Sequence, residues 1–205
     1  MRFCYFGDSI SVHYGPYLET YLCGSAAGSR MEGAAEALSN LDTPQGTNTG
    51  DSSMLLAFFK NKAESGGIDS DLLLFNCGLH DIKTDPVTGA KQIPLPQYRE
   101  NLKAILGVLA GMKPRPVWIR TTPCDEAVHN HAGSTFLRFS ADGVAYNQAA
   151  DQIMAEAGIP VIDLYTFTLN LGSELYCDHV HFHEHIREKQ AAYLAGWLAA
   201  FVLKA

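Results

Sequence analysis

The sequence DLLLFNC, residues 71–77, has four consecutive apolar residues at its centre. A strand with one face in water alternates apolar and polar residues, whereas a strand covered on both faces is apolar throughout. We therefore predict that residues 71–77 form a strand buried on both faces. Such strands are typical of parallel sheets that carry helices on either side.

Three other segments resemble this one: RFCYF (residues 2–6), PVWIRT (116–121) and PVIDL (160–164). Between and after the strands lie segments with helical spacing of apolar residues, at 11–24, 51–62, 96–109, 142–157 and 184–203. This alternation predicts an α/β fold, a three-layer α/β/α sandwich around a parallel sheet of about five strands. A second strand is poorly defined, because the connection after residue 24 has no clear pattern.

Length and composition predict one domain over residues 1–205. Hydrophobic residues make up 47% and charged residues 18%, which is typical of a globular chain. The net charge of −7 and the lack of a basic patch argue against nucleic acid as a partner. No apolar run approaches the ~20 residues of a membrane span.

The N-terminus MRFCYFGDS reaches a turn too early to hold a signal peptide. We therefore expect a cytoplasmic protein, with secretion open if a signal has been removed. The cysteines are scattered and odd in number, which favours reduced thiols over a disulfide framework or a zinc site. They are Cys4, Cys23, Cys77, Cys124 and Cys177, and the first and third of these lie in apolar runs that predict burial.

Polar clusters follow the predicted strands. They are GDSI (residues 7–10), NTGD (48–51), GLHD (78–81) and DHVH (178–181). In an open parallel sheet, ligands bind beyond the carboxyl ends of the strands, so we expect the clusters to meet at one edge. Ser9 alone is more often a helix N-cap, and Gly50 alone a turn glycine. Together, the clusters supply a nucleophile, oxyanion donors, a base and a residue that orients the base.

In order and content these clusters resemble the SGNH (GDSL-type) hydrolase superfamily, over nearly the whole chain from FGDSI (6–10) to DHVH (178–181). The resemblance implies a flavodoxin-like fold and a serine esterase that needs no metal or organic cofactor. It implies that Ser9 is the nucleophile, His181 the general base and Asp178 the residue that orients His181. The implied oxyanion donors are the backbone N–H groups of Ser9 and Gly50 and a side chain of the third cluster.

The third cluster departs from the family pattern Gly-x-Asn-Asp, because His80 stands where the family has asparagine. A neutral histidine donates from only one ring nitrogen, so we expect a partner on the other nitrogen. A protonated His80 would donate more strongly but would lower the basicity of His181. Either His80 replaces the amide as oxyanion donor or the site is weakened, and we predict the first.

Three further residues are candidates for supporting the site or contacting the substrate: Asp8, Asp81 and Arg138. Asp81 is the neighbour of His80. Arg138 belongs to a long connection, residues 124–139, which follows a strand at the same edge, where loops carry specificity. Arg138 either binds a polar or anionic substrate group or is a solvated arginine.

The stretch DHVHFHEH, residues 178–185, holds four of the chain's eight histidines. Its HFHEH part matches the H-x-x-E-H pattern of some zinc proteases, which needs a helix from His181 and a third protein ligand. That pattern explains none of the other clusters, so we predict no metal site. We expect His179, His183 and His185 to be exposed or partly exposed, and His13, His129 and His131 to be surface or loop residues.

The chain has no large insertion that could form a lid or a lipid-binding surface. We therefore predict hydrolysis of short-chain O-acyl esters, with a carbohydrate O-acetyl ester or another small ester as the substrate. The alternatives are a lysophospholipase or thioesterase on the same fold, and a metal-binding or non-catalytic protein that uses residues 179–185. The sequence leaves the oligomeric state open.

Overall fold

A parallel sheet lies at the centre of the computed structural model, which describes residues 1–131 and 134–202. Its strands are β1 (Arg2–Phe6), β2 (Ala27–Ser29), β3 (Leu72–Phe75), β4 (Arg115–Ile119) and β5 (Val161–Ile162). The strand order is β2-β1-β3-β4-β5 and every pairing is parallel. This confirms the predicted α/β class with about five parallel strands, in the strand order of flavodoxin-like folds.

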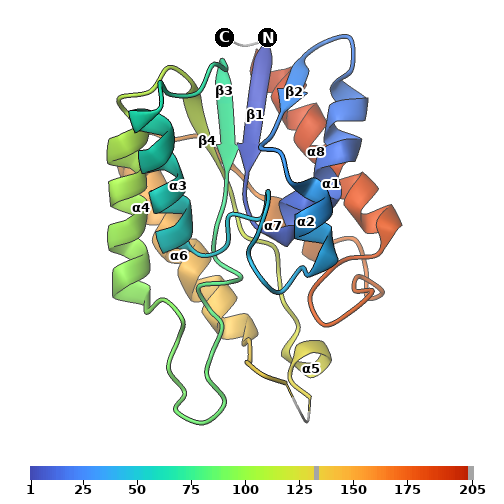
Figure 1. Cartoon of the computed structure of the whole chain (residues 1–205). Coiled ribbons are helices and arrows are strands. Elements are labelled where there is room, and N and C mark those ends of the chain that lie inside the picture. The colour runs from blue at the N-terminus through green and yellow to red at the C-terminus, as the bar shows by residue number, and fades with distance from the viewer. Residues whose placement is uncertain (132–133, 203–205) are drawn as a thin grey trace.

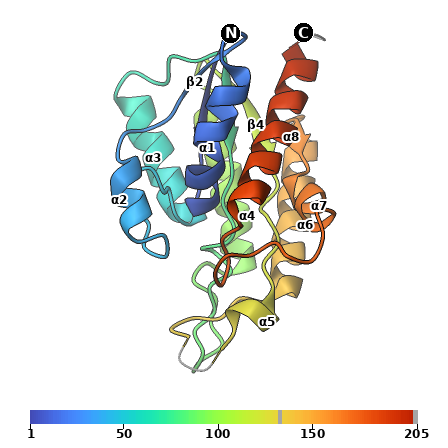
Figure 2. The same cartoon turned by 90° about the vertical axis from the view of Figure 1, so that its right-hand side faces the viewer.

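Helices cover both faces of the sheet (Figures 1 and 2), which confirms the three-layer arrangement. On one face α1 (Ser9–Leu22) packs beside α8 (Glu184–Val202), and α7 (Leu164–Leu169) contacts α8. On the other face α3 (Ser52–Glu64), α4 (Leu95–Leu109) and α6 (Ser140–Glu156) lie side by side. All residues of β3 are buried between these layers, which is why its sequence is apolar throughout.

The ends of several elements differ from the prediction for reasons of capping. Helix α1 begins at Ser9 and not at residue 11, because the Asp8 carboxylate accepts the backbone N–H of Ile10. Strand β5 ends at Ile162, because Asp163 caps the unpredicted helix α7. The predicted end of the last helix, Leu203, lies outside the described residues.

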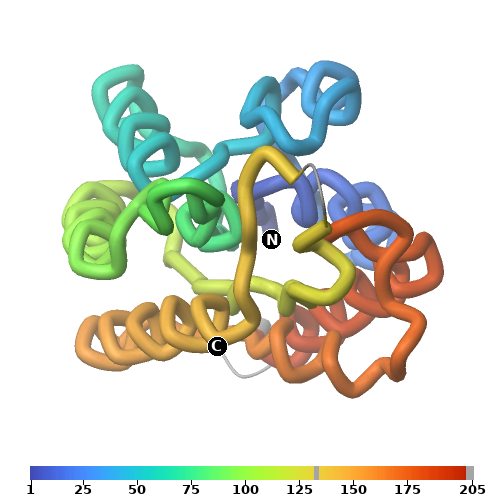
Figure 3. The backbone as a smooth tube through the Cα atoms, turned by 90° about the horizontal axis from the view of Figure 1, so that it is seen from below, coloured from blue at the N-terminus to red at the C-terminus, as the bar shows by residue number. Residues whose placement is uncertain are grey.

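The carboxyl ends of the strands point to the lower edge of the molecule in Figure 1, away from both termini. Figure 3 looks onto this edge, where the segment around α5 (Glu126–His129) passes in front of the sheet. Two predicted clusters reach the edge by unpredicted routes. Asn48 follows α2 (Ala34–Ser39) and pairs with Gly7 in an isolated parallel bridge. Residues 178–181 follow α7 and lie in a turn closed by the bridge between Tyr176 and Phe182.

Among the described residues, no helix combines the length and the apolar character that crossing a bilayer requires. All five cysteines are free thiols. Cys4 and Cys77 are buried, as their apolar runs predicted.

Candidate active site

Ser9, His181 and Asp178 form a continuous hydrogen-bonded chain at the carboxyl edge of the sheet. The Ser9 Oγ atom lies 2.8 Å from Nε2 of His181. The other ring nitrogen, Nδ1, lies 2.8 Å and 3.0 Å from the two carboxylate oxygens of Asp178. Ser9 and His181 are 4% and 1% exposed, so their contact is shielded from bulk water.

The start of α1 presents Ser9 to this chain. Asp8 caps the helix through its side chain and also accepts the Ser11 hydroxyl at its backbone carbonyl, at 2.7 Å. The N–H of Ser9 is among the first of the helix, which have no partner within the helix and carry partial positive charge. Asp8 is fully buried, and burial raises the pKa of its carboxyl group. Its contacts support the turn that holds Ser9.

The turn that carries Asp178 fixes which ring nitrogen of His181 carries a proton. Partial burial disfavours the Asp178 carboxylate, but hydrogen bonds from the His181 ring and from the N–H groups of Val180 and His181 outweigh this and lower its pKa. An ionised carboxylate can only accept, so the proton of His181 facing Asp178 sits on Nδ1. We infer that, in the tautomer a general base requires, His181 turns the lone pair of Nε2 toward Ser9.

Gly50 occupies a position that strongly favours glycine. Its φ is +66°, and an added Cβ would lie 2.6 Å from the Met54 sulfur and 2.8 Å from the Pro44 Cβ. Its N–H, predicted as an oxyanion donor, donates to the Asn48 side-chain oxygen at 3.1 Å. An incoming oxyanion would therefore have to share this N–H with Asn48 or displace the Asn48 oxygen.

His80 lies in a tight turn after β3, in which the Ile82 N–H donates to the Gly78 carbonyl at 3.0 Å. Gly78 has a φ of +153°, and an added Cβ would lie 2.5 Å from the Thr121 hydroxyl. The His80 side chain is 1% exposed, and burial lowers its pKa well below the ordinary value, so the ring is neutral. The partner expected on its other nitrogen is not found, since the structure gives His80 Nδ1 no hydrogen bond among the described residues.

Asp81 supports the site through the backbone and not through the His80 ring. Its two carboxylate oxygens accept the N–H of Ser52, at 3.0 Å and 3.1 Å. Ser52 opens α3 two residues after Gly50, so Asp81 ties the His80 turn to the Gly50 turn. Burial raises the pKa of Asp81 to about 8.

Arg138 is buried, and the interpretation as a solvated arginine is wrong. It is 2% exposed, its Nε donates to the Leu79 carbonyl at 2.8 Å, and its Nη1 lies 3.0 Å from Nε2 of His129. Asn130 closes the loop by pairing with the backbone N–H and carbonyl of Arg138. The same closure buries His129, which was wrongly predicted as a surface or loop residue and is 3% exposed.

The sequence model of the GDSL-like lipase/acylhydrolase family matches residues 5–186, from β1 to the start of α8. The chain belongs to this family. The SGNH (GDSL-type) prediction is thereby confirmed, and the acylhydrolase is a carboxylic ester hydrolase. A search of curated proteins found no match.

Solved structures share the fold of this acylhydrolase. A lipolytic protein of the G-D-S-L family from Veillonella parvula DSM 2008 has 17% identity and a TM-score of 0.67, covering 96% of this chain and 97% of its own. The acetyl xylan esterase AlAXEase has 14% identity and a TM-score of 0.66, with 97% and 99% covered. The M. smegmatis aryl esterase has 15% identity and a TM-score of 0.65, with 97% and 98% covered.

His131 is exposed, as predicted, and four other histidines of the acylhydrolase form two groups. His183 and His185 are exposed and stack on each other, as expected for the start of α8. His13 and His179 are half-buried, and each ring packs edge-on against the ring of His181, at 5.2 Å and 5.9 Å. Burial lowers the pKa of His13 to about 3. The prediction of His13 as a surface or loop residue is wrong, although its spacing from Ser9 puts both on one helix face.

The zinc-protease pattern does not fit this structure, because α8 begins at Glu184 and His181 lies outside it. A different set, Asp178, His179 and His181, brings possible ligand atoms within 4.8 Å of one another. Both ring nitrogens of His181 already contact Ser9 and Asp178, and His179 Nε2 contacts Asp42. A metal ion would have to break the Ser9–His181 chain in order to use all three ligands.

Proposed function

We propose that the acylhydrolase is a serine esterase that hydrolyses short-chain O-acyl esters, with O-acetyl groups on carbohydrates as its substrates. One observation carries the proposal: the hydrogen-bonded chain from Asp178 through His181 to Ser9. That chain provides an activated nucleophile, a base of defined tautomer and a carboxylate that stabilises the charged base.

In the proposed first half-reaction, the Ser9 hydroxyl oxygen attacks the ester carbonyl carbon while Nε2 of His181 takes the hydroxyl proton. The resulting imidazolium is stabilised by the ionised Asp178 carboxylate at Nδ1. The tetrahedral intermediate then collapses. The C–O bond to the alcohol breaks, His181 gives its proton to the departing oxygen, and the acyl group remains on Ser9.

In the second half-reaction, water attacks the acyl-Ser9 carbonyl and His181 again accepts the proton. Collapse returns the proton to the Ser9 oxygen and releases the carboxylic acid. Each half-reaction passes through an oxyanion, which preorganised donors stabilise. We assign this role to three donors: the backbone N–H of Ser9, the backbone N–H of Gly50 and Nε2 of His80. The Gly50 N–H becomes available when its hydrogen bond to the Asn48 side chain breaks.

The short acyl group rests on two supports. The chain has no long insertion that could cover an extended acyl chain, and the acetyl xylan esterase AlAXEase shares the fold over 97% of this chain. An enzyme with a long apolar channel gains about 0.8 kcal/mol of binding for each buried methylene group. An enzyme without one gains nothing from a longer acyl chain.

Acyl-chain preference tests this proposal. We expect kcat/KM on p-nitrophenyl esters to be highest for the acetyl or butyryl ester and to fall for longer chains. A maximum at acyl chains of about eight carbons or more would instead favour the lysophospholipase or thioesterase alternative. Acetylated methyl glycosides, assayed by acetate release, provide the carbohydrate arm of the same experiment.

A further inference from the structure

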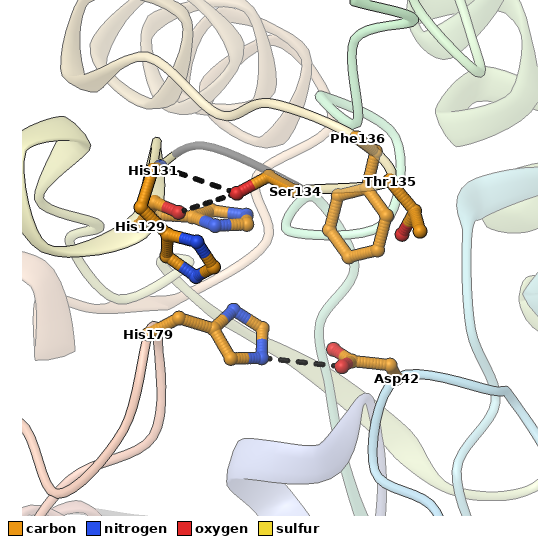
Figure 4. A pocket seen from close by; sticks show the side chains of 7 residues that line it. All are labelled: Asp42, His129, His131, Ser134, Thr135, Phe136 and His179. Carbon is orange, nitrogen blue, oxygen red and sulfur yellow. Dashed lines mark hydrogen bonds and ion pairs between the residues drawn. The ribbon is translucent and has the colours of Figure 1, made fainter.

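A pocket of about 190 Å³ lies beside the hydrogen-bonded chain, on the side of His179. Figure 4 shows its walls: Asp42 and His179 along one side, with His129 and Phe136 facing them. The ring of His179 is 5.9 Å from that of His181, so a ligand in this pocket would adjoin the base that protonates the departing alcohol. The reaction steps described above leave these four side chains without a role.

Asp42 and His179 bring buried polar atoms to the wall of this pocket. The hydrogen bond to His179 at 3.2 Å holds the pKa of Asp42 near 2, so the carboxylate is ionised. An ionised carboxylate can only accept, which puts a proton on Nε2 of His179 and leaves Nδ1 of the ring for another partner. Within the described residues, neither the second carboxylate oxygen of Asp42 nor Nδ1 of His179 has a partner.

His129 presents a donor. The Arg138 guanidinium can only donate, so Nε2 of His129 accepts from it and the proton of His129 sits on Nδ1. Burial lowers the pKa of His129 to about 4, which keeps the ring neutral. His129 is 3% exposed, and its Nδ1 is another buried group without a hydrogen-bond partner in the described parts of the chain.

Buried polar atoms without partners are uncommon in proteins, and a substrate that satisfies them gains affinity and specificity. Here one acceptor, one donor and one further ring nitrogen lie on side chains that line the pocket together with the half-buried ring of Phe136. A hydroxyl group both donates and accepts, and the C–H face of a sugar ring can pack on an aromatic ring. We propose that this pocket binds the alcohol part of the ester, and that this alcohol is a polyhydroxylated ring of the sugar type.

The proposal rests on the proposed esterase activity at Ser9 and extends it to the substrate's second half. An anionic alcohol fits the pocket less well. The cations beside Phe136, Lys83 and Arg138, do not line the pocket, and each already donates to a backbone carbonyl, of Asp42 and Leu79 respectively. The Asp42 carboxylate does line the pocket and would repel an anion.

Two variants of the pocket, Asp42→Asn and Phe136→Ala, test the proposal through selectivity. The quantity to measure is the kcat/KM for an acetylated methyl glycoside divided by that for p-nitrophenyl acetate. We expect this ratio to fall by about tenfold or more in each variant, because only the glycoside brings hydroxyl groups to the pocket. Asp69→Asn is the matched control, since it removes the same charge from an exposed residue just before β3, at the opposite edge.

A ratio that stays at the wild-type value in both variants would overturn the proposal, as would a wild-type enzyme that cleaves p-nitrophenyl acetate but no acetylated glycoside. An equal loss of kcat/KM on both substrates would show that the pocket only supports His181. That result would also overturn the proposal. A separate result would overturn the esterase proposal: full activity of Ser9→Ala on both substrates.

Discussion

Replacing Ser9 with alanine is expected to lower kcat for p-nitrophenyl acetate by about 10⁵- to 10⁶-fold, the loss that follows removal of a nucleophilic serine. The Ser9 oxygen lies 2.8 Å from His181, and no acyl-enzyme can form without it. Steady-state rates at high enzyme concentration measure the loss. Ser11→Ala is the matched control. Ser11 lies on the same helix and its hydroxyl donates to the Asp8 backbone carbonyl, away from His181, so we expect activity within about tenfold of wild type.

One result in Ser9→Ala would contradict this prediction. Full esterase activity in Ser9→Ala, abolished by a chelator, would mean that hydrolysis depends on a metal ion. The set of Asp178, His179 and His181 would then be the first place to look for its ligands. A loss in Ser9→Ala together with an equal loss in Ser11→Ala would point to damage to the start of α1.

The second large effect is expected at His80, where the family has asparagine. Removing one oxyanion donor lowers kcat by about 10²- to 10³-fold, and we expect this loss in His80→Ala. His80→Asn restores an amide donor, and we expect it to keep kcat within about tenfold of wild type. An unchanged kcat in His80→Ala would remove His80 from the mechanism.

The pH dependence of kcat separates donation by a neutral ring from donation by a charged one. Burial lowers the pKa of His80 well below its ordinary value, and a histidine is neutral above its pKa. The donor strength of His80 therefore does not change between about pH 6 and about pH 9. We expect wild type and His80→Asn to have profiles of the same shape in this range. A loss of activity with rising pH in wild type alone would show that the protonated ring is the donor.

The apolar runs of the sequence were enough to predict the central strands. The segments 71–77 and 116–121 are apolar at their centres because helices cover both faces of the sheet there, and this burial is visible in the local sequence. Strand β2 has the sequence AGS and is partly exposed, so it carries no such signal. It pairs with β1 at the edge of the sheet, and only the folded neighbour makes it a strand.

The candidate site also contains residues with a local sequence signal and residues without one. Ser9, His181 and Asp178 belong to short clusters with recognisable spacing, so the sequence predicts them together. Asp42 has no local signal, because its contact with His179 joins segments that only the folded chain brings together.

The charge of Arg138 made a solvated side chain one of its two interpretations from sequence. The contacts of the folded loop, with Leu79, His129 and Asn130, decide its burial.

Covalent labelling tests the central claim most directly. An organophosphate such as diethyl p-nitrophenyl phosphate transfers its phosphoryl group to an activated serine and releases p-nitrophenol. Intact mass followed by peptide mapping should find a single diethylphosphoryl group, on the peptide that contains Ser9, and none in Ser9→Ala. Stable labelling of another residue while Ser9 stays unmodified, in an enzyme that loses its esterase activity on labelling, would contradict the account.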